Sequence, residues 1–213
     1  MLDRLFGRRD DEDEKRKEGR LPPGQSLTQR FPVLHYGPVP PFNPAKWTLR
    51  VFGEVEQEVT WTWEEFQKLP RTTITMDLHC VTRWSKFDTA WEGVSVATLV
   101  NEGLIKLKPT ARYLMQHCEN DFTVNVPLDV ALAPNFLLAT HYDGQPITPD
   151  HGYPLRGVIG QIVGDSHKTP YLWKGGKWLR GLEFMAQDRL GFWEQAGYHN
   201  EADVWKEERF AYD

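Results

Sequence analysis

Residues 72–84 read TTITMDLHCVTRW, and this stretch combines a strand pattern with a cysteine near its end. The apolar side chains Ile74, Met76 and Leu78 alternate with polar neighbours, which is typical of a half-buried strand. Cys80 therefore lies where a strand gives way to a turn. A thiolate there is held rigidly and can face a cleft, as a soft-metal ligand or a nucleophile requires. The alternative is a buried, unreactive thiol, because a single cysteine carries little information.

A second motif, HGYPLR at 151–156, predicts a rigid turn with a basic group at each end. Gly152 and Pro154 favour the turn, and they bring His151 and Arg156 to its two sides. A guanidinium binds phosphate through two parallel hydrogen bonds, so this pair suits a phosphate or a polar heterocycle. An ordinary surface loop is the alternative.

A third motif contains two adjacent glycines, Gly175 and Gly176, followed by Lys177. Glycines let a backbone approach a ligand closely, and successive N–H groups can form an anion-binding concavity. Lys177 would add a point charge, whereas a plain hairpin turn is the alternative. Taken together, the three motifs supply one cysteine for a metal and several basic groups for a phosphorylated organic ligand.

Composition narrows the class of protein. The 213 residues can bury one substantial core, and a content of 40% hydrophobic and 13% aromatic residues indicates a folded chain. The formal net charge of −5 argues against a general nucleic-acid binder, and no apolar run is long enough to span a bilayer. Two cysteines are too few for a disulfide framework. Arg8 and Arg9 precede acidic residues rather than an apolar stretch, so we expect a cytoplasmic location.

The chain divides into a charged start and one domain. Residues 1–25 hold blocks of both charges and a Pro/Gly linker, which predicts a disordered tail. Residues 26–213 would form a single domain with a C-terminal extension. The proline-rich stretch 31–41 forbids a helix, so we expect an extended arm that lies on the core.

Strand patterns dominate the rest of the chain, with short helices between them. A capping box of Thr62 and Glu65 starts one helix, and Ser95 can cap another that begins at Val96. A further helical turn is expected at 128–132. The remaining strand patterns lie at 47–51, 59–61, 112–116, 136–141, 155–159 and 177–184. Without a regular alternation of strands and helices, this order predicts a mixed α+β fold and disfavours a Rossmann-like sheet.

The ordered set of motifs resembles the molybdopterin-binding domain of the sulfite-oxidase family. The resemblance covers about residues 31–184 and is strongest to short stand-alone bacterial members, which are related to the periplasmic methionine-sulfoxide reductase. Its landmarks are HYGP at 35–38, CVTRWS at 80–85, WEGV at 91–94, HGYPLR at 151–156 and GGKW at 175–178. The resemblance implies a strand-rich sulfite-oxidase-type fold and a molybdenum–molybdopterin cofactor.

The resemblance also implies roles for individual residues. Cys80 would ligate molybdenum, and Arg83 would attract an anionic substrate or stabilise the transferred oxygen, unless it is a salt-bridged surface residue. The pterin and its phosphate would be held by His151, Arg156, Gly175, Gly176 and Lys177, with His35, Tyr36 and Cys118 also approaching the cofactor. The implied reaction is oxygen-atom transfer with a small sulfur-containing or oxyanion substrate and an unidentified redox partner. A monomer is plausible.

One departure and two alternatives stay open. The segment 160–170 lengthens the connection between two family motifs, and it would be either a lid or a surface loop. A structural zinc site could use the pairs His79-Cys80 and His117-Cys118, although neighbours on a strand point to opposite faces. The fold could also serve as a non-catalytic cofactor carrier or binding module, but the retained cysteine and basic residues favour an enzyme.

Overall fold

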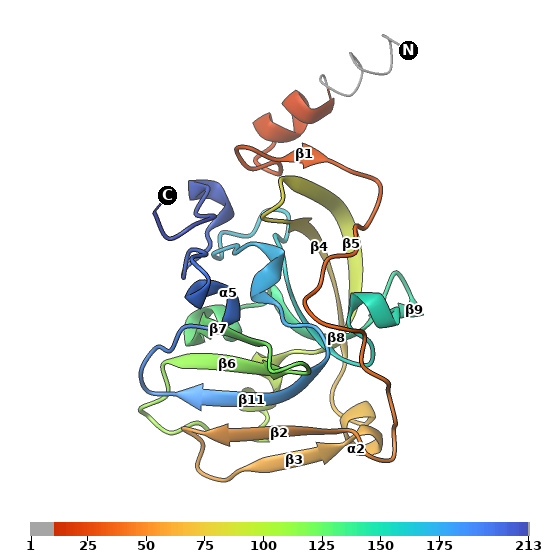
Figure 1. Cartoon of the computed structure of the whole chain (residues 1–213), viewed down its shortest axis with the longest axis vertical. Coiled ribbons are helices and arrows are strands. Elements are labelled where there is room, and N and C mark those ends of the chain that lie inside the picture. The colour runs from red at the N-terminus through yellow and green to blue at the C-terminus, as the bar shows by residue number, and fades with distance from the viewer. Residues whose placement is uncertain (1–10, 213) are drawn as a thin grey trace.

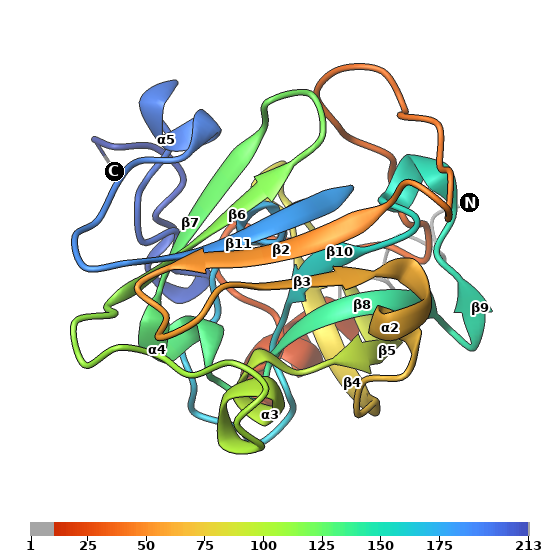
Figure 2. The same ribbon diagram turned by 90° about the horizontal axis from the view of Figure 1, so that it is seen from below.

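The computed structural model describes residues 11–212, and its frame is two β-sheets. One sheet has five strands, and β2 pairs with β11 in parallel while its other pairs are antiparallel. Figure 2 shows this sheet from its outer side. Its spatial order is β3 (Val59–Thr62), β2 (Thr48–Gly53), β11 (Leu179–Met185), β6 (Tyr113–Cys118) and β7 (Thr123–Pro127).

The second sheet carries a long hairpin that rises away from the first sheet (Figure 1). The hairpin strands are β4 (Thr72–His79) and β5 (Trp84–Val94), and they are antiparallel. The other strands are β1 (Ser26–Leu27), β8 (Phe136–Tyr142), β9 (Gln145–Pro146) and β10 (Arg156–Ile159). Because the turn between β4 and β5 contains Cys80, the hairpin places that residue at its tip.

Helices are short, and their starts follow the sequence. The four labelled α-helices are α2 (Trp63–Gln67), α3 (Val96–Asn101), α4 (Leu128–Ala131) and α5 (Phe192–Gln195), with 3₁₀ turns η1 (Pro149–His151), η2 (Leu172–Lys174) and η3 (Val204–Lys206). The capping box of Thr62 and Glu65 and the cap at Ser95 are confirmed. The mixed, strand-rich α+β architecture is therefore confirmed too. Among the described residues, no helix has both the length and the apolar character needed to cross a bilayer.

The two faces of strand β8 belong to different cores. Leu138 is fully buried in the larger core, which lies between the sheets, while Leu137 and Ala139 are buried in a smaller core on the other face. Each buried leucine contributes about 1.5–3 kcal/mol by removing apolar surface from water. Strand β10, which begins with Arg156, is also buried on both faces and is therefore held rigidly.

The N-terminal segment is ordered where the structure describes it. Residues 11–17 are helical, and the buried Leu21 is 1% exposed. Arg20 donates to the carboxylate of the buried Asp77 on β4, at 2.7 and 2.8 Å. This salt bridge and the burial of Leu21 attach the segment to the domain, while the division into a disordered tail and one domain stays a prediction. The remainder of the predicted tail, residues 1–10, lies outside the described residues.

Candidate active site

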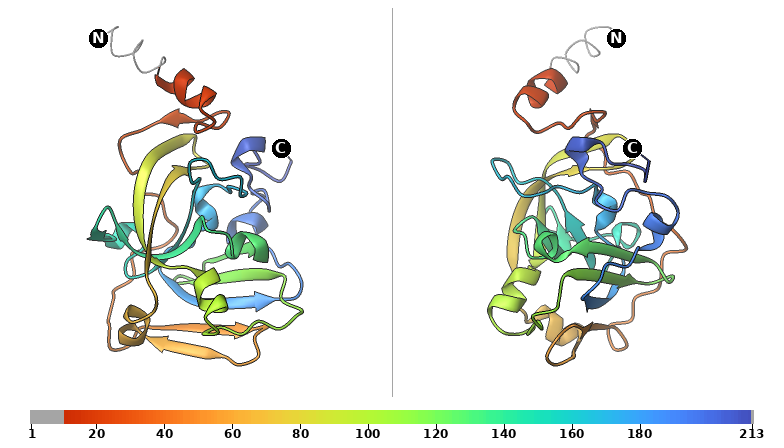
Figure 3. Two further views of the ribbon diagram at one scale, coloured as in Figure 1. Left: turned by 180° about the vertical axis from the view of Figure 1, so that it is seen from behind. Right: turned by 90° about the vertical axis from the view of Figure 1, so that its left-hand side faces the viewer.

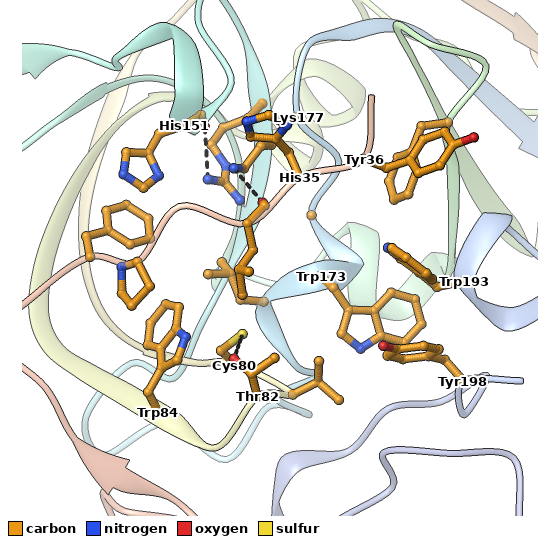
Figure 4. Close-up of a pocket in the computed structure, with 18 of the residues that line it drawn as sticks. His35, Tyr36, Cys80, Thr82, Trp84, His151, Trp173, Lys177, Trp193 and Tyr198 are labelled. Carbon is orange, nitrogen blue, oxygen red and sulfur yellow. Dashed lines mark hydrogen bonds between the residues drawn. The ribbon is translucent and has the colours of Figure 1, made fainter. Parts of the chain in front are cut away.

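A cavity of about 340 Å³ opens at the tip of the β4–β5 hairpin. Its walls come from the proline-rich arm, the turn after β4, the turn at η1, the loop around η2 and the segment after β11 (Figure 4). His35 and Tyr36 of the arm line the cavity, and their contact with a cofactor stays a prediction. The lining also includes Cys80, Thr82, Trp84, His151, Arg156, Trp173, Gly175, Lys177, Trp193 and Tyr198.

Cys80 is held by a tight turn. Its backbone N–H donates to the carbonyl of Trp84 at 2.9 Å, and the N–H of Arg83 donates back to the Cys80 carbonyl at 3.0 Å. The Sγ atom lies 3.2 Å from the hydroxyl of Thr82. Burial raises the pKa of the Cys80 thiol. A cation at this point would offset that effect by favouring the thiolate.

Arg156 brings a buried positive charge to the cavity. It is 2% exposed, and its guanidinium donates to two backbone carbonyls, those of Gly157 and His151, both at 3.0 Å. No carboxylate within residues 11–212 forms an ion pair with it at 4.0 Å or less. Burial lowers the pKa of Arg156 to about 10. A buried charge without a counter-charge is unfavourable, so this position is suited to an anionic ligand.

Lys177 and His151 extend the basic wall. The Lys177 ammonium donates to the carbonyls of Leu34 at 2.8 Å and Asp150 at 2.7 Å. Burial, and then the charge of Arg156, lower the pKa of Lys177 to about 7. Burial and the charge of Lys177 lower the pKa of His151 to about 4, so His151 is neutral at neutral pH. The charges of Arg156 and Lys177 repel each other, and an anion beside them would relieve that repulsion.

Several buried polar atoms around the cavity have no hydrogen-bond partner among the described residues. They include the Nε1 atoms of Trp84 and Trp173 and the Nδ1 atom of His151. Phe31 stacks on the imidazole of His151 with ring centroids 3.9 Å apart. The rings of Trp173 and Tyr198 meet edge to face with centroids 5.6 Å apart. Buried polar groups normally have partners, so these atoms are available to bond a polar ligand in the cavity.

Arg83 does not belong to this wall. Its side chain is 64% exposed and lies 3.9 Å from Glu207, and it does not line the cavity. The backbone of Arg83 has φ of 72°, which turns the side chain out of the hairpin tip. The predicted catalytic role is therefore not supported, and the alternative of a salt-bridged surface arginine is what the structure shows.

Cys118 and Gly176 lie behind the cavity rather than in its lining. A Cβ atom on Gly176 would come 2.4 Å from the Sγ of Cys118, and one on Gly175 would come 2.4 Å from the carbonyl of Gly157. The N–H of Gly176 already donates to Gln116 at 2.9 Å. The glycine pair thus allows close packing against β6 and β10, and Gly175 lines the cavity, while the role of the pair in cofactor binding stays a prediction.

The zinc alternative is not supported by the geometry. His79 bonds to Ser85 at 2.8 Å and to Gln161 at 3.3 Å, whereas His117 bonds to Glu183 at 2.7 Å. Within residues 11–212, no three His, Cys, Asp or Glu side chains gather as a metal site would require. The segment 160–170 does not line the cavity either; its middle is exposed, whereas Gln161 and Thr169 near its ends are buried.

Twelve lining residues were not singled out from the sequence as site residues. They include Thr82, Trp84, Trp173, Trp193 and Tyr198. Thr82 and Trp84 stand within the cysteine motif, so the motif itself contained their signal. Trp173 directly precedes the Lys174-Gly175-Gly176-Lys177 motif, whereas Trp193 and Tyr198 come from the C-terminal segment, where the density of aromatic residues is the signal.

The chain matches the model of the family described as the oxidoreductase molybdopterin binding domain over residues 36–193, and it belongs to that family. YuiH, an oxidoreductase of Bacillus subtilis strain 168, is 41% identical over 198 residues, which cover 92% of this chain and 95% of that protein. The chain is therefore a molybdenum-cofactor oxidoreductase of the sulfite-oxidase type.

More distant relatives are larger proteins. A protein-methionine-sulfoxide reductase subunit of Azospira oryzae, YedZ1, is 28% identical over 83% of this chain and 64% of its own length. Human mitochondrial sulfite oxidase is 25% identical over 83% of this chain, which spans 37% of that enzyme. The sulfane dehydrogenase SoxCD of Paracoccus pantotrophus has the same fold, with a TM-score of 0.60 and 20% identity over 72% of this chain and 41% of that one.

The cavity fits the molybdenum–molybdopterin cofactor that the family binds. Arg156 is a buried cation that bonds to backbone carbonyls and has no carboxylate partner among the described residues, which suits a phosphate ligand. The unpaired Nε1 atoms and His151 Nδ1 can bond a polar ring system, and Cys80 offers a soft ligand for a metal. Among residues 11–212, Arg156, Lys177 and His151 would hold the organic part, with Cys80 at the metal end.

Proposed function

We propose that Cys80 ligates molybdenum and that the protein transfers an oxygen atom to or from a small sulfur-containing or oxyanion substrate. The observation that supports this proposal is the composition of one cavity wall. Cys80, Arg156, Lys177 and His151 line the same cavity of about 340 Å³, although they come from distant parts of the chain. A thiol and an unpaired cationic group are what a metal dithiolene with a phosphate tail needs.

When bound, the cofactor supplies a metal that exchanges two electrons as it gives or accepts an oxygen atom. The protein's own residues then have distinct tasks. Arg156 and Lys177 bind and orient the anionic part through charge-assisted hydrogen bonds. Trp84, Trp173 and Tyr198 form apolar walls that exclude water, which strengthens those hydrogen bonds.

The electrons require a second protein or carrier, so the proposal includes a redox partner that delivers or removes them. The sizes of the cavity and of the lining side chains favour a small-molecule substrate once the cofactor is in place. A cytoplasmic location and a monomeric state also stay part of the proposal.

The test is production of the protein in a host that makes molybdenum cofactor, followed by elemental analysis and pterin fluorescence. Wild type should contain close to one molybdenum per chain. Cys80→Ala should lose the oxygen-transfer activity and most of the metal, because no other lining side chain offers a thiolate. Cys118→Ala is the matched control, since Cys118 lies outside the cavity lining, and it should keep both.

Substrate class is tested with the same preparation. Sulfite with an oxidising dye and organic sulfoxides with a reducing dye would be assayed side by side. Turnover with either group supports the proposal and fixes the direction of the reaction. Full activity and full metal content in Cys80→Ala would contradict it.

A further inference from the structure

The turn that carries Cys80 is held by a side chain from before the family domain. Gln25 is 1% exposed, and its amide nitrogen donates to the Cys80 carbonyl at 3.0 Å and to the Trp84 carbonyl at 3.2 Å. The same amide oxygen accepts a hydrogen bond from Arg209 at 3.2 Å. One buried side chain therefore joins both ends of the turn.

Arg209 supplies the other half of this contact from the far end of the chain. It is 3% exposed, and its guanidinium donates to the carbonyl of Val81 at 2.6 Å. It also lies over the ring of Tyr171, 4.7 Å from the ring centroid. Figures 1 and 3 show the two terminal segments lying side by side at the tip of the β4–β5 hairpin.

The turn depends on these contacts because few backbone bonds hold it. Between Cys80 and Trp84 the hairpin has one N–H bond across the turn and one within it, and β1 adds a bond from Ser26 to the Arg83 carbonyl. Without Gln25 and Arg209, the carbonyls of Cys80 and Trp84 would each keep only one backbone donor, and the carbonyl of Val81 would lose the donor that Arg209 provides, which is unfavourable. The Sγ of Cys80 would then lose its fixed position.

Neither residue lies within the family domain, which spans residues 36–193. We propose that Gln25 and Arg209 are positioning residues, which fix the backbone of the Cys80 turn so that the thiolate meets the metal in one geometry. This inference rests on the proposed role of Cys80 as the molybdenum ligand. A ligand displaced by about 1 Å no longer matches the geometry that the metal requires.

The experiment uses the full-length, cofactor-loaded protein. Gln25→Met keeps the size of the side chain and removes the amide, Arg209→Met removes the guanidinium, and Arg209→Lys keeps the charge without the planar fork. Arg50→Met is the matched control, because Arg50 bonds to Glu58 on the surface and not to the site. Hydrogen exchange over residues 78–86 and the Mo(V) electron paramagnetic resonance spectrum are the two readouts.

Loss of the hydrogen bonds from either Gln25 or Arg209 should speed hydrogen exchange of the Cys80 and Arg83 amides roughly tenfold to a hundredfold, as expected when a buried hydrogen bond is removed. The Mo(V) spectrum should change in all three variants, while Arg50→Met matches wild type. The double variant should exchange no faster than the stronger single variant, because both side chains act on one turn. Arg209→Lys should resemble Arg209→Met, since one ammonium cannot serve both acceptors in the same geometry.

Wild-type exchange rates and an unchanged spectrum in Gln25→Met would overturn the inference. Exchange rates and a Mo(V) spectrum like those of wild type in Arg209→Lys would overturn it too, because the positive charge alone would then be enough. These outcomes are distinct from failure of the proposed function, which is read from the molybdenum content of Cys80→Ala. If Gln25→Met does not fold, Arg209→Lys carries the test with the same readouts.

Discussion

Acid should destabilise this protein through His79, the residue directly before the proposed metal ligand. His79 is 1% exposed, and its two ring nitrogens bond to Ser85 and Gln161. Burial lowers the pKa of His79 to about 3, and the nearby charge of Arg20 acts in the same direction. The folded protein therefore keeps this imidazole neutral above about pH 3.

The direction and size of the effect follow from proton linkage. Above the unfolded-state pKa of about 6.5, both states hold a neutral imidazole, and the full stability is present. Below it, the unfolded chain takes up a proton that the folded protein does not, so stability falls by up to about 1.4 kcal/mol per pH unit. Between pH 6.5 and pH 5 the loss is about 2 kcal/mol, and it continues towards pH 3, the folded-state value.

Urea unfolding of the cofactor-free protein at pH 7, 6 and 5 measures this loss. His79→Gln keeps a polar side chain but cannot take up a proton, so its free energy of unfolding should lose about 2 kcal/mol less over the same range. His151→Gln serves as a comparison, because the pKa of His151 is also lowered by burial but its ring is less buried. Equal pH dependence in wild type and His79→Gln would refute the reasoning.

Three further outcomes are expected. Lys174→Met should lower stability by about 3–5 kcal/mol in urea unfolding, because it leaves the buried carboxylate of Glu194 unpaired; adding Glu194→Leu should recover most of this loss, and no recovery would count against the pair. Arg83→Gly should keep molybdenum content and turnover within about twofold and leave stability equal or higher by up to about 1 kcal/mol, since glycine accepts its positive φ; a large drop in kcat would restore a catalytic role. Gly176→Ala should destabilise by about 1–3 kcal/mol in thermal unfolding, and adding Cys118→Ala should relieve part of that, because the new methyl would meet the Cys118 sulfur.

The sequence predicted the elements whose patterns are local. The capping box at Thr62, the strand before Cys80 and the turn around His151 follow from spacing and turn chemistry, and the structure has them. The family motifs predicted that Cys80, Arg156 and Lys177 share one site, and all three line the cavity. Their spacing in the sequence alone does not fix the distances between them.

Other elements were not predicted from the sequence because their side chains depart from the usual alternation of apolar and polar residues. Strand β5 was not predicted, since two of its inward positions are the polar residues Ser85 and Thr89. Those hydroxyls are buried because they bond to His79 and to the backbone of Met76. The outward turn of Arg83 could not be predicted either, because it depends on one positive φ at the hairpin tip.

The contact between Gln25 and Arg209 sets an order of events during synthesis. Gln25 and Cys80 leave the ribosome first, and the chain must grow through residues 81–209 before the last donor to the turn exists. At about 5–20 residues per second, that interval is on the order of ten seconds. During that time the turn that carries Cys80 lacks the hydrogen bonds from Arg209. Stable insertion of the cofactor is thus expected only after translation has passed Arg209.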